Sequence, residues 1–186
     1  DFDRLRTDLL AEPSDTFLYR DFNARNVMLV DGEPWFIDFQ GGRRGPVYYD
    51  VASFLWQARA RYPEDLREDL LQTYLEALRV YGPVDETHFR ERLRLFVLFR
   101  LLQVLGCYGY RGLWEGKQAF IDSIPPALGL LRSLLPFENY PYLSEVLAKL
   151  CGGAPQEGVF FPEPVATLGR IRGRGPEGLG RGRGGW

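Results

Sequence analysis

The chain has 186 residues, of which 45% are hydrophobic and 15% aromatic, enough to build one folded domain with a tail. Its 23 basic and 25 acidic side chains give a formal net charge of -2, which argues against a generally basic nucleic-acid-binding protein. Two cysteines and one histidine exclude a disulfide-rich scaffold and a structural zinc site. Because we find no run of about 18 apolar residues and no signal segment, we expect no membrane span and a cytoplasmic location.

The first part of the chain predicts a helix followed by a strand. Charged residues and leucine recur at helical spacing over residues 1–11, and Pro13 follows the expected helix end. Residues 16–20 then form a short apolar run that predicts a buried strand. These elements lead directly into the most informative part of the sequence.

Two further apolar runs, 27–30 and 34–37, predict a β-hairpin. The residues between them include the Asp-Gly pair at 31–32, which is typical of a two-residue hairpin loop. Glycines and a proline over residues 41–46 indicate an irregular loop after the hairpin.

From Tyr49 onward the pattern is helical. Asp50 is expected to cap the first helix, and Asp85 or Thr87 the long apolar one. Within that long helix we expect a buried apolar stripe that includes Phe99, and a buried Cys107 near its end. The expected helices cover 51–61, 64–80, 88–107, 112–122, 124–135 (interrupted by its prolines) and 141–151.

The last residues have a different composition. Glycine and arginine dominate residues 152–186, which predicts a flexible low-complexity tail after a folded unit over 1–151. An Arg-Gly tract can bind RNA, but a plain flexible terminus is the favoured interpretation because the folded part is acidic. We therefore do not expect nucleic acid as a main partner.

Three polar side chains converge at the open end of the predicted hairpin. With a loop at 31–32, Asn26 falls opposite Ile37 and so lies beside Asp38. Asp21 lies five residues before Asn26, at the exit of the preceding strand. Carboxylate and amide oxygens suit Mg²⁺, and a further Asp can accept a proton from a hydroxyl. The arrangement is typical of a phosphoryl-transfer site.

Four motifs in this order resemble the aminoglycoside phosphotransferase and choline-kinase-like family of kinase-fold enzymes. Within it, the stretch over residues 20–53 is most similar to bacterial amino-sugar kinases that act on N-acetylmuramate and N-acetylglucosamine. The resemblance covers residues 1 to about 150. It implies an α+β, mainly α-helical fold, the C-terminal lobe of a protein-kinase-like fold with a small catalytic hairpin on a helical bundle. The motifs are Asp21-x4-Asn26, Ile37-Asp38-Phe39, Gly45-Pro46 and Tyr49-Asp50.

The resemblance also implies roles for individual residues. Asp21 is implied as the general base that orients the acceptor hydroxyl. Asn26 and Asp38 are implied to hold Mg²⁺ on the phosphates of ATP. Asp50 is expected to tie down the catalytic loop, and Arg25 either neutralises the transferring phosphate or pairs with an acid.

Two positions depart from the family pattern. Tyr19 stands where the family usually has His before Arg20-Asp21, and we expect both Tyr19 and Arg20 to support the loop. Asn23 stands where many relatives have His, so we treat it as a candidate for substrate contact. Further along, Tyr108, Arg111 and Trp114 form a candidate acceptor wall, with aromatic core packing as the alternative.

Neither a Gly-rich loop nor a strand lysine is found before these motifs. We therefore expect a C-terminal lobe whose parent protein supplies an N-terminal nucleotide lobe. The predicted function is ATP-dependent phosphorylation of a small sugar-like substrate, in the recycling of cell-wall sugars. The alternatives left open are a non-catalytic kinase-like module that needs a partner lobe, and a kinase of aminoglycosides or other small alcohols.

Overall fold

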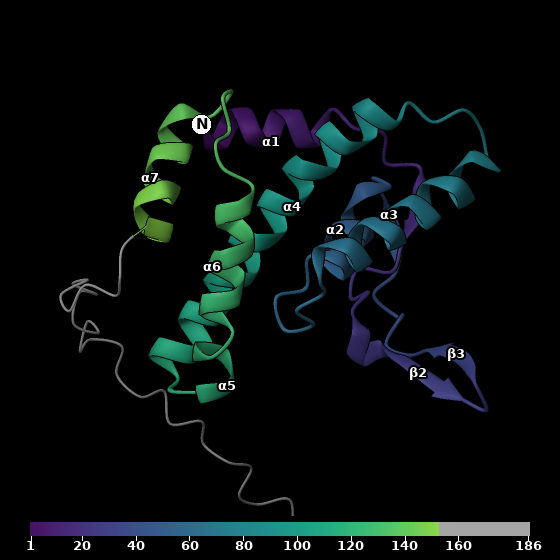
Figure 1. Cartoon of the computed structure of the whole chain (residues 1–186), viewed down its shortest axis with the longest axis horizontal. Helices are drawn as coiled ribbons and strands as arrows, with labels where there is room; N and C mark the ends of the chain where they lie inside the picture. Colours follow the sequence, from purple (N-terminus) through teal and green to yellow (C-terminus); the bar gives the residue numbers. More distant parts are fainter. Residues whose placement is uncertain (153–186) are drawn as a thin grey trace, which may run out of the picture. The chain divides into compact units, whose positions relative to one another are not determined.

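The computed structural model describes residues 1–152, so the prediction of a tail over 152–186 lies almost wholly outside the described residues. In the described part, helices dominate and β2 (Val27–Val30) and β3 (Glu33–Phe36) form a hairpin, as Figure 1 shows. The strands form two small antiparallel sheets. This confirms the expected α+β, mainly α-helical class.

The chain begins with helix α1 (Phe2–Leu10), as predicted, and continues into strand β1 (Thr16–Leu18). Strand β1 pairs with β4 (Arg43–Gly45), which the sequence analysis placed in an irregular loop. Three residues of sequence Arg-Arg-Gly carry no apolar alternation, so no local pattern marks them as a strand.

Close contact between the two strands explains the glycine in β4. Gly45 is buried opposite Thr16, whose hydroxyl donates to the Gly45 carbonyl oxygen at 2.7 Å. A Cβ atom at Gly45 would overlap the Leu18 side chain, with Cγ only 2.8 Å away. The pairing therefore requires a residue without a side chain at this position.

The second sheet is the predicted hairpin of β2 (Val27–Val30) and β3 (Glu33–Phe36), in the predicted register. Both loop residues, Asp31 and Gly32, have positive φ, at 53° and 85°. Positive φ at both central residues is the geometry that favours an Asp-Gly sequence in two-residue hairpin loops.

Helix α2 (Tyr48–Leu55) starts earlier and ends earlier than the predicted helix over 51–61. Val47 occupies the N-cap position, so the expectation that Asp50 caps this helix is wrong. Tyr48 is buried against Phe89 and Phe96, which places the helix start in the core. Asp50 instead lies in the first turn, where a negative charge is favourable.

Two longer helices agree closely with the sequence. Helix α3 (Glu64–Arg79) and helix α4 (Glu86–Tyr108) match the expected segments within two residues at every boundary. Of the two cap candidates for α4, Asp85 occupies the N-cap, and its side chain accepts from the backbone N–H of His88 at 3.0 Å.

Helix α4 supplies much of the core. Its residues Val97 and Leu98 are fully buried, and the helix packs mainly against α2. Phe99 and Cys107, in contrast, are exposed, so the expectation of burial for these two residues is wrong. Both lie on faces of α4 that the neighbouring helices leave open.

After α4 the chain departs from the predicted helix over 112–122. A π-helical turn, η2 (Gly109–Trp114), continues α4 and ends in a turn at Gly116, whose φ is 69°. The short helix α5 (Gln118–Ile121) follows. Helix α6 (Ile124–Ser133) accommodates the two prolines in its first turn, where no backbone N–H is needed, and α7 (Pro141–Gly152) lies as predicted.

One helical stretch within residues 1–152, Glu86–Trp114, is long and apolar enough by length and composition to cross a membrane. The sequence analysis found no such run, because the charges in α4 lie mainly in its first half. The first part of this stretch, α4, contributes six buried residues to the core. The absence of a membrane span therefore stays a prediction.

Candidate active site

The loop that carries Asp21 is anchored to α2 by Asp50. The carboxylate of Asp50 accepts hydrogen bonds from the backbone N–H groups of Tyr19, at 2.5 Å, and Arg20, at 2.9 Å. Burial raises the pKa of the Asp50 carboxyl, and the two backbone donors act in the opposite direction. Arg20 has a φ of 74°, so these contacts hold the chain in a conformation that non-glycine residues seldom adopt.

The backbone carbonyl of Asp21 organises the turn that follows. It accepts from the side-chain amides of Asn23, at 2.9 Å, and Asn26, at 2.8 Å. Asn26 is 5% exposed and belongs to the 3-10 turn η1 (Ala24–Asn26). The carboxylate of Asp21 itself stays exposed, so the turn presents it to solvent and to a ligand.

The hairpin brings Asp38 to the same region. The backbone N–H of Ile37 donates to the Asn26 carbonyl oxygen at 3.0 Å, and the Tyr19 hydroxyl donates to the Ile37 carbonyl oxygen. Asp38 follows with a φ of 69°, and one of its carboxylate oxygens accepts from the Gln40 side chain at 2.6 Å. The residue before Asp38 is thus tied to both Asn26 and Tyr19.

The electrostatics of Tyr19 show how closely the carboxylates gather. Burial raises the pKa of the Tyr19 hydroxyl, and the negative charges of Asp38, Asp21 and Asp50 raise it further. Three carboxylates from different parts of the chain therefore act on one phenol.

The side-chain oxygens of Asn26 and Asp38 are of the kind that Mg²⁺ takes as ligands. The Nδ2 atom of Asn26 is occupied by the Asp21 carbonyl, which leaves Oδ1 as the free acceptor of that amide. Asp38 keeps one carboxylate oxygen without a hydrogen bond from residues 1–152. Two oxygen ligands are enough for Mg²⁺ when phosphate and water fill the remaining positions. The described residues contain no cluster of three or more His, Cys, Asp or Glu side chains that would suit a fully protein-ligated metal.

A cleft of about 670 Å³ opens beside Asp21. Its walls come from η1, the end of α2 and the loop after it, the second half of α4, η2 and α5. It brings together most of the substrate candidates from the sequence. These are Asp21, Asn23, Arg25, Tyr108 and Arg111.

The structure does not bring Trp114 to this cleft, since its side chain is 59% exposed at the end of η2. Two arginines that the sequence analysis did not single out, Arg59 and Arg100, do line it. Arg59 follows α2 and Arg100 lies within α4. No motif marks either residue, because only the packing of α2 against α4 brings them near Asp21.

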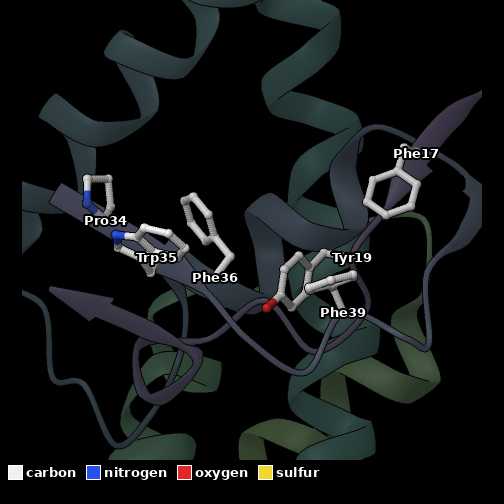
Figure 2. A pocket seen from close by; sticks show the side chains of 6 residues that line it. All are labelled: Phe17, Tyr19, Pro34, Trp35, Phe36 and Phe39. Atoms are coloured by element: carbon white, nitrogen blue, oxygen red, sulfur yellow. The ribbon is translucent and has the colours of Figure 1, made fainter. Parts of the chain in front are cut away.

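A second, more apolar pocket of about 520 Å³ lies at the hairpin. Figure 2 shows Tyr19 and Phe39 near its centre, Phe17 on one side, and the β3 residues along the other. Phe17, Trp35 and Phe39 are each at least 60% exposed. Strand β3 and the segment that begins with β1 thus share a surface of aromatic rings that includes Phe39, the residue after Asp38. Its lining is Phe17, Tyr19, Pro34, Trp35, Phe36 and Phe39.

A family model described as "Phosphotransferase enzyme family" matches residues 1–86. This match covers both small sheets and all three residues of the site, Asp21, Asn26 and Asp38. Residues 1–86 are thus similar to the members of this family. The resemblance seen in the sequence is confirmed by this match.

Three curated proteins similar to this chain all carry the name N-acetylmuramate/N-acetylglucosamine kinase. The protein from Neisseria meningitidis serogroup B is 37% identical over 134 residues, which is 70% of this chain and 40% of the relative. The protein from Pseudomonas aeruginosa is 30% identical over 156 residues, 82% of this chain and 46% of the relative. The protein from Pseudomonas putida is 27% identical over 149 residues, 78% and 44%. The chain therefore spans less than half the length of these relatives.

Proposed function

We propose that this chain is the catalytic lobe of a kinase that transfers the γ-phosphate of ATP to a hydroxyl group of an amino sugar. One arrangement carries the proposal. The Asp21 carboxylate lines a substrate-sized cleft, while its own backbone carbonyl is hydrogen-bonded to Asn26, an oxygen donor beside Asp38. The names of the three relatives support an amino sugar as the acceptor.

Each residue of the site has a role in this reaction. Asp21 accepts a hydrogen bond from the acceptor hydroxyl and takes its proton as the phosphate is transferred. Asn26 and Asp38 would hold Mg²⁺, which when bound neutralises charge on the phosphates. Arg25 follows η1's first residue and lines the same cleft, where it can stabilise negative charge on the transferring group. The Asp50 contacts keep the loop in the geometry that these roles require.

The aromatic surface at the hairpin supports a catalytic lobe over a self-sufficient binding module. Contiguous exposed apolar surface usually marks a contact with a partner or ligand. Here it includes Phe39, the residue after Asp38, and aromatic rings can stack on a nucleobase. We propose that this surface receives the nucleotide together with a further lobe. The three relatives are more than twice as long as their matched parts, so such a lobe would fit within their length.

An aminoglycoside kinase is the less favoured candidate. Aminoglycosides are cationic and need an acidic acceptor site. The cleft beside Asp21 is lined by four arginines and by one carboxylate, that of Asp21 itself. Its charge opposes a polycationic acceptor.

Nucleotide binding tests the metal site. In the intact protein, calorimetry measures binding of ATP with Mg²⁺ to the unmodified form and to the variants Asp38→Asn and Glu33→Gln. Glu33 is an exposed acid on the same hairpin, so its substitution removes the same charge away from the site. We expect Asp38→Asn to weaken binding at least about tenfold and Glu33→Gln to leave it unchanged. Equal binding by both variants would remove Asp38 from the site.

Phosphate transfer tests the base. In the intact protein, Asp21→Asn should lower kcat for phosphorylation of N-acetylglucosamine and N-acetylmuramate by about 10²- to 10⁴-fold, with the fold retained. A variant that keeps most of the rate would exclude Asp21 as the base. Absence of transfer to either sugar by the unmodified intact protein would overturn the proposed acceptor class.

A further inference from the structure

The cleft beside Asp21 is strongly basic. Its charged lining residues are Asp21 and four arginines, Arg25, Arg59, Arg100 and Arg111. The chain as a whole has a formal net charge of -2, so this concentration of positive charge is local. A confined cleft with one sign of charge attracts ligands of the opposite sign.

Most of this charge is not neutralised by the protein. Arg111 forms a loose, exposed pair with Glu115 at 3.4 Å. Within residues 1–152, Arg25, Arg59 and Arg100 form no salt bridge. These three cations are therefore not cancelled by an ion pair, although burial raises the pKa of the Asp50 carboxyl and the charge of Arg100 acts to lower it.

Arg59 is held in place by neutral groups. Its Nε donates to the Ser123 hydroxyl and its Nη2 to the Ala119 carbonyl oxygen, each at 2.8 Å. Its guanidinium carbon lies 5.0 Å from the centre of the Phe120 ring and 5.9 Å from that of Tyr108. The contacts orient the guanidinium without cancelling its charge, and its Nη1 makes no hydrogen bond inside the described part of the chain.

Arg100 is oriented in a similar way from α4. Its Nη1 donates to the Tyr49 hydroxyl at 2.8 Å, and its guanidinium carbon lies 4.8 Å from the centre of the Tyr49 ring. Its Nε is buried without a hydrogen-bond partner among residues 1–152. Nη1 also donates to the Gln103 side chain, whereas Nη2 makes no hydrogen bond inside the described part of the chain. Nη2 is therefore the donor that is left for an anion in the cleft.

The positive charges of three of these arginines act together on the Tyr108 hydroxyl. Burial raises the pKa of the Tyr108 hydroxyl, while the charges of Arg59, Arg100 and Arg25 all lower it. Three arginines from three separate elements thus act on one side chain in the cleft. The convergence is a property of the folded site, since these residues are far apart in the sequence.

We propose that Arg59 and Arg100 are specificity-determining residues that bind an anionic group, a carboxylate or a phosphate, on the acceptor sugar. The inference rests on the proposed function and adds the feature by which the site selects among amino sugars. Arg25, next to Asn26, lies closer in the chain to the phosphate-transfer residues, whereas Arg59 and Arg100 come from the helical side of the cleft. A charged group on the sugar held there would orient its hydroxyl toward Asp21.

The test compares three sugars that differ in charge. Calorimetry measures binding of N-acetylmuramate, N-acetylglucosamine and N-acetylglucosamine 6-phosphate to the chain, without nucleotide. The variants are Arg59→Gln, Arg100→Gln and Arg100→Lys, with Arg4→Gln as control. Arg4 lies exposed on α1, away from the cleft lining, and its substitution removes the same charge.

We expect at least one anionic sugar to bind about tenfold or more tightly than the neutral sugar. Arg59→Gln and Arg100→Gln should each weaken its binding about tenfold while changing binding of the neutral sugar less than twofold, and Arg4→Gln should change neither. Arg100→Lys keeps the charge but loses the planar fork, so it should retain part of the preference. Comparing N-acetylmuramate, which carries a carboxylate, with N-acetylglucosamine 6-phosphate identifies which anion the site accepts.

Other results separate the two proposals. Equal binding of all three sugars, or equal losses for all of them in both Gln variants, would overturn the specificity role and leave the amino-sugar kinase standing. Binding of no sugar at all, while ATP with Mg²⁺ binds, would overturn the amino-sugar acceptor and this inference with it.

Discussion

The carboxylate of Asp50 accepts a hydrogen bond from the backbone N–H of Tyr19 at 2.5 Å, across 31 positions of sequence. The same carboxylate accepts from the next N–H, that of Arg20. One side chain on α2 therefore holds the start of the loop that presents Asp21. The contact connects the packing of α2 in the core to the geometry of the site.

Replacing Asp50 should loosen this connection. Asp50→Ala removes both acceptors and leaves two N–H groups without partners, so we expect a loss of about 1–3 kcal/mol in the free energy of unfolding. The burial that raises the pKa of Asp50 keeps the loss toward the lower end. Urea denaturation measures it, with the exposed Asp69→Ala on α3 as the control. A loss no larger than that of the control would contradict the anchoring role.

The side-chain amide of Asn26 should matter for both stability and binding. Asn26→Ala removes the hydrogen bond to the Asp21 carbonyl at 2.8 Å in a position that is 5% exposed. We expect a loss of about 1–3 kcal/mol in the free energy of unfolding, together with weaker binding of ATP with Mg²⁺. Asn139→Ala, at an exposed position after α6, serves as the control. Unchanged nucleotide binding in a folded Asn26 variant would mean that Asn26 is structural only.

A charged network between α3 and α4 predicts a dependence of stability on pH. Arg90 hydrogen-bonds to Glu68 and lowers the pKa of its carboxyl; hydrogen bonds from Gln72 and then Arg90 lower that of Glu86. A lowered carboxyl pKa gives stability that is present above the ordinary value of 4.5 and is lost as the pH falls through the lowered value. For the exposed pair of Glu68 and Arg90 the effect should be small, about 0.2–1 kcal/mol.

Unfolding measured by urea between pH 6 and about pH 3 tests this network. Glu68→Gln should flatten the fall in stability below pH 4.5, and high salt should reduce the difference from the unmodified chain. Glu76→Gln, an exposed acid on α3 outside the network, should follow the unmodified curve. If the curve for Glu68→Gln matches those of the unmodified chain and of Glu76→Gln, the Glu68–Arg90 pair adds nothing to stability.

Two glycines should respond oppositely to alanine. In α6, Gly129 is exposed and a Cβ there meets nothing within 4 Å, so Gly129→Ala should stabilise the chain by about 0.5–1 kcal/mol. Gly45→Ala should destabilise it by about 1–3 kcal/mol, because its Cβ would overlap Leu18 between β1 and β4. Thermal unfolding compares the two variants directly. A Gly45→Ala variant as stable as the parent would show that β1 and β4 can separate at no cost.

Local sequence was informative wherever neighbouring residues determine the geometry. The Asp31-Gly32 loop predicted the hairpin register, because its two positive φ angles suit these residues and few others. Asp85 was one of the two residues predicted as the N-cap of α4. A side-chain oxygen three residues before His88 can reach the backbone N–H of His88. Both features involve residues close in the chain.

Features that depend on distant contacts were missed or misplaced. Strand β4 exists because β1 lies beside it, and Asp50 binds the loop near Tyr19 instead of capping its own helix. Cys107 and the Phe99 ring lie in an apolar stretch, but their exposure depends on which faces of α4 the other helices cover. Hydrophobicity alone does not distinguish those faces.

The amino-acid sequence by itself determined the helical class, the hairpin and the family resemblance carried by Asp21, Asn26 and Asp38, because these rest on short-range geometry and on ordered motifs. Only the tertiary structure decided that Arg59 and Arg100 share a cleft with Asp21, and that Trp114 lies outside its lining. The physical reason is that α2 and α4 pack through their apolar residues, and this packing sets where their polar side chains meet. Residues with no common motif thereby become neighbours.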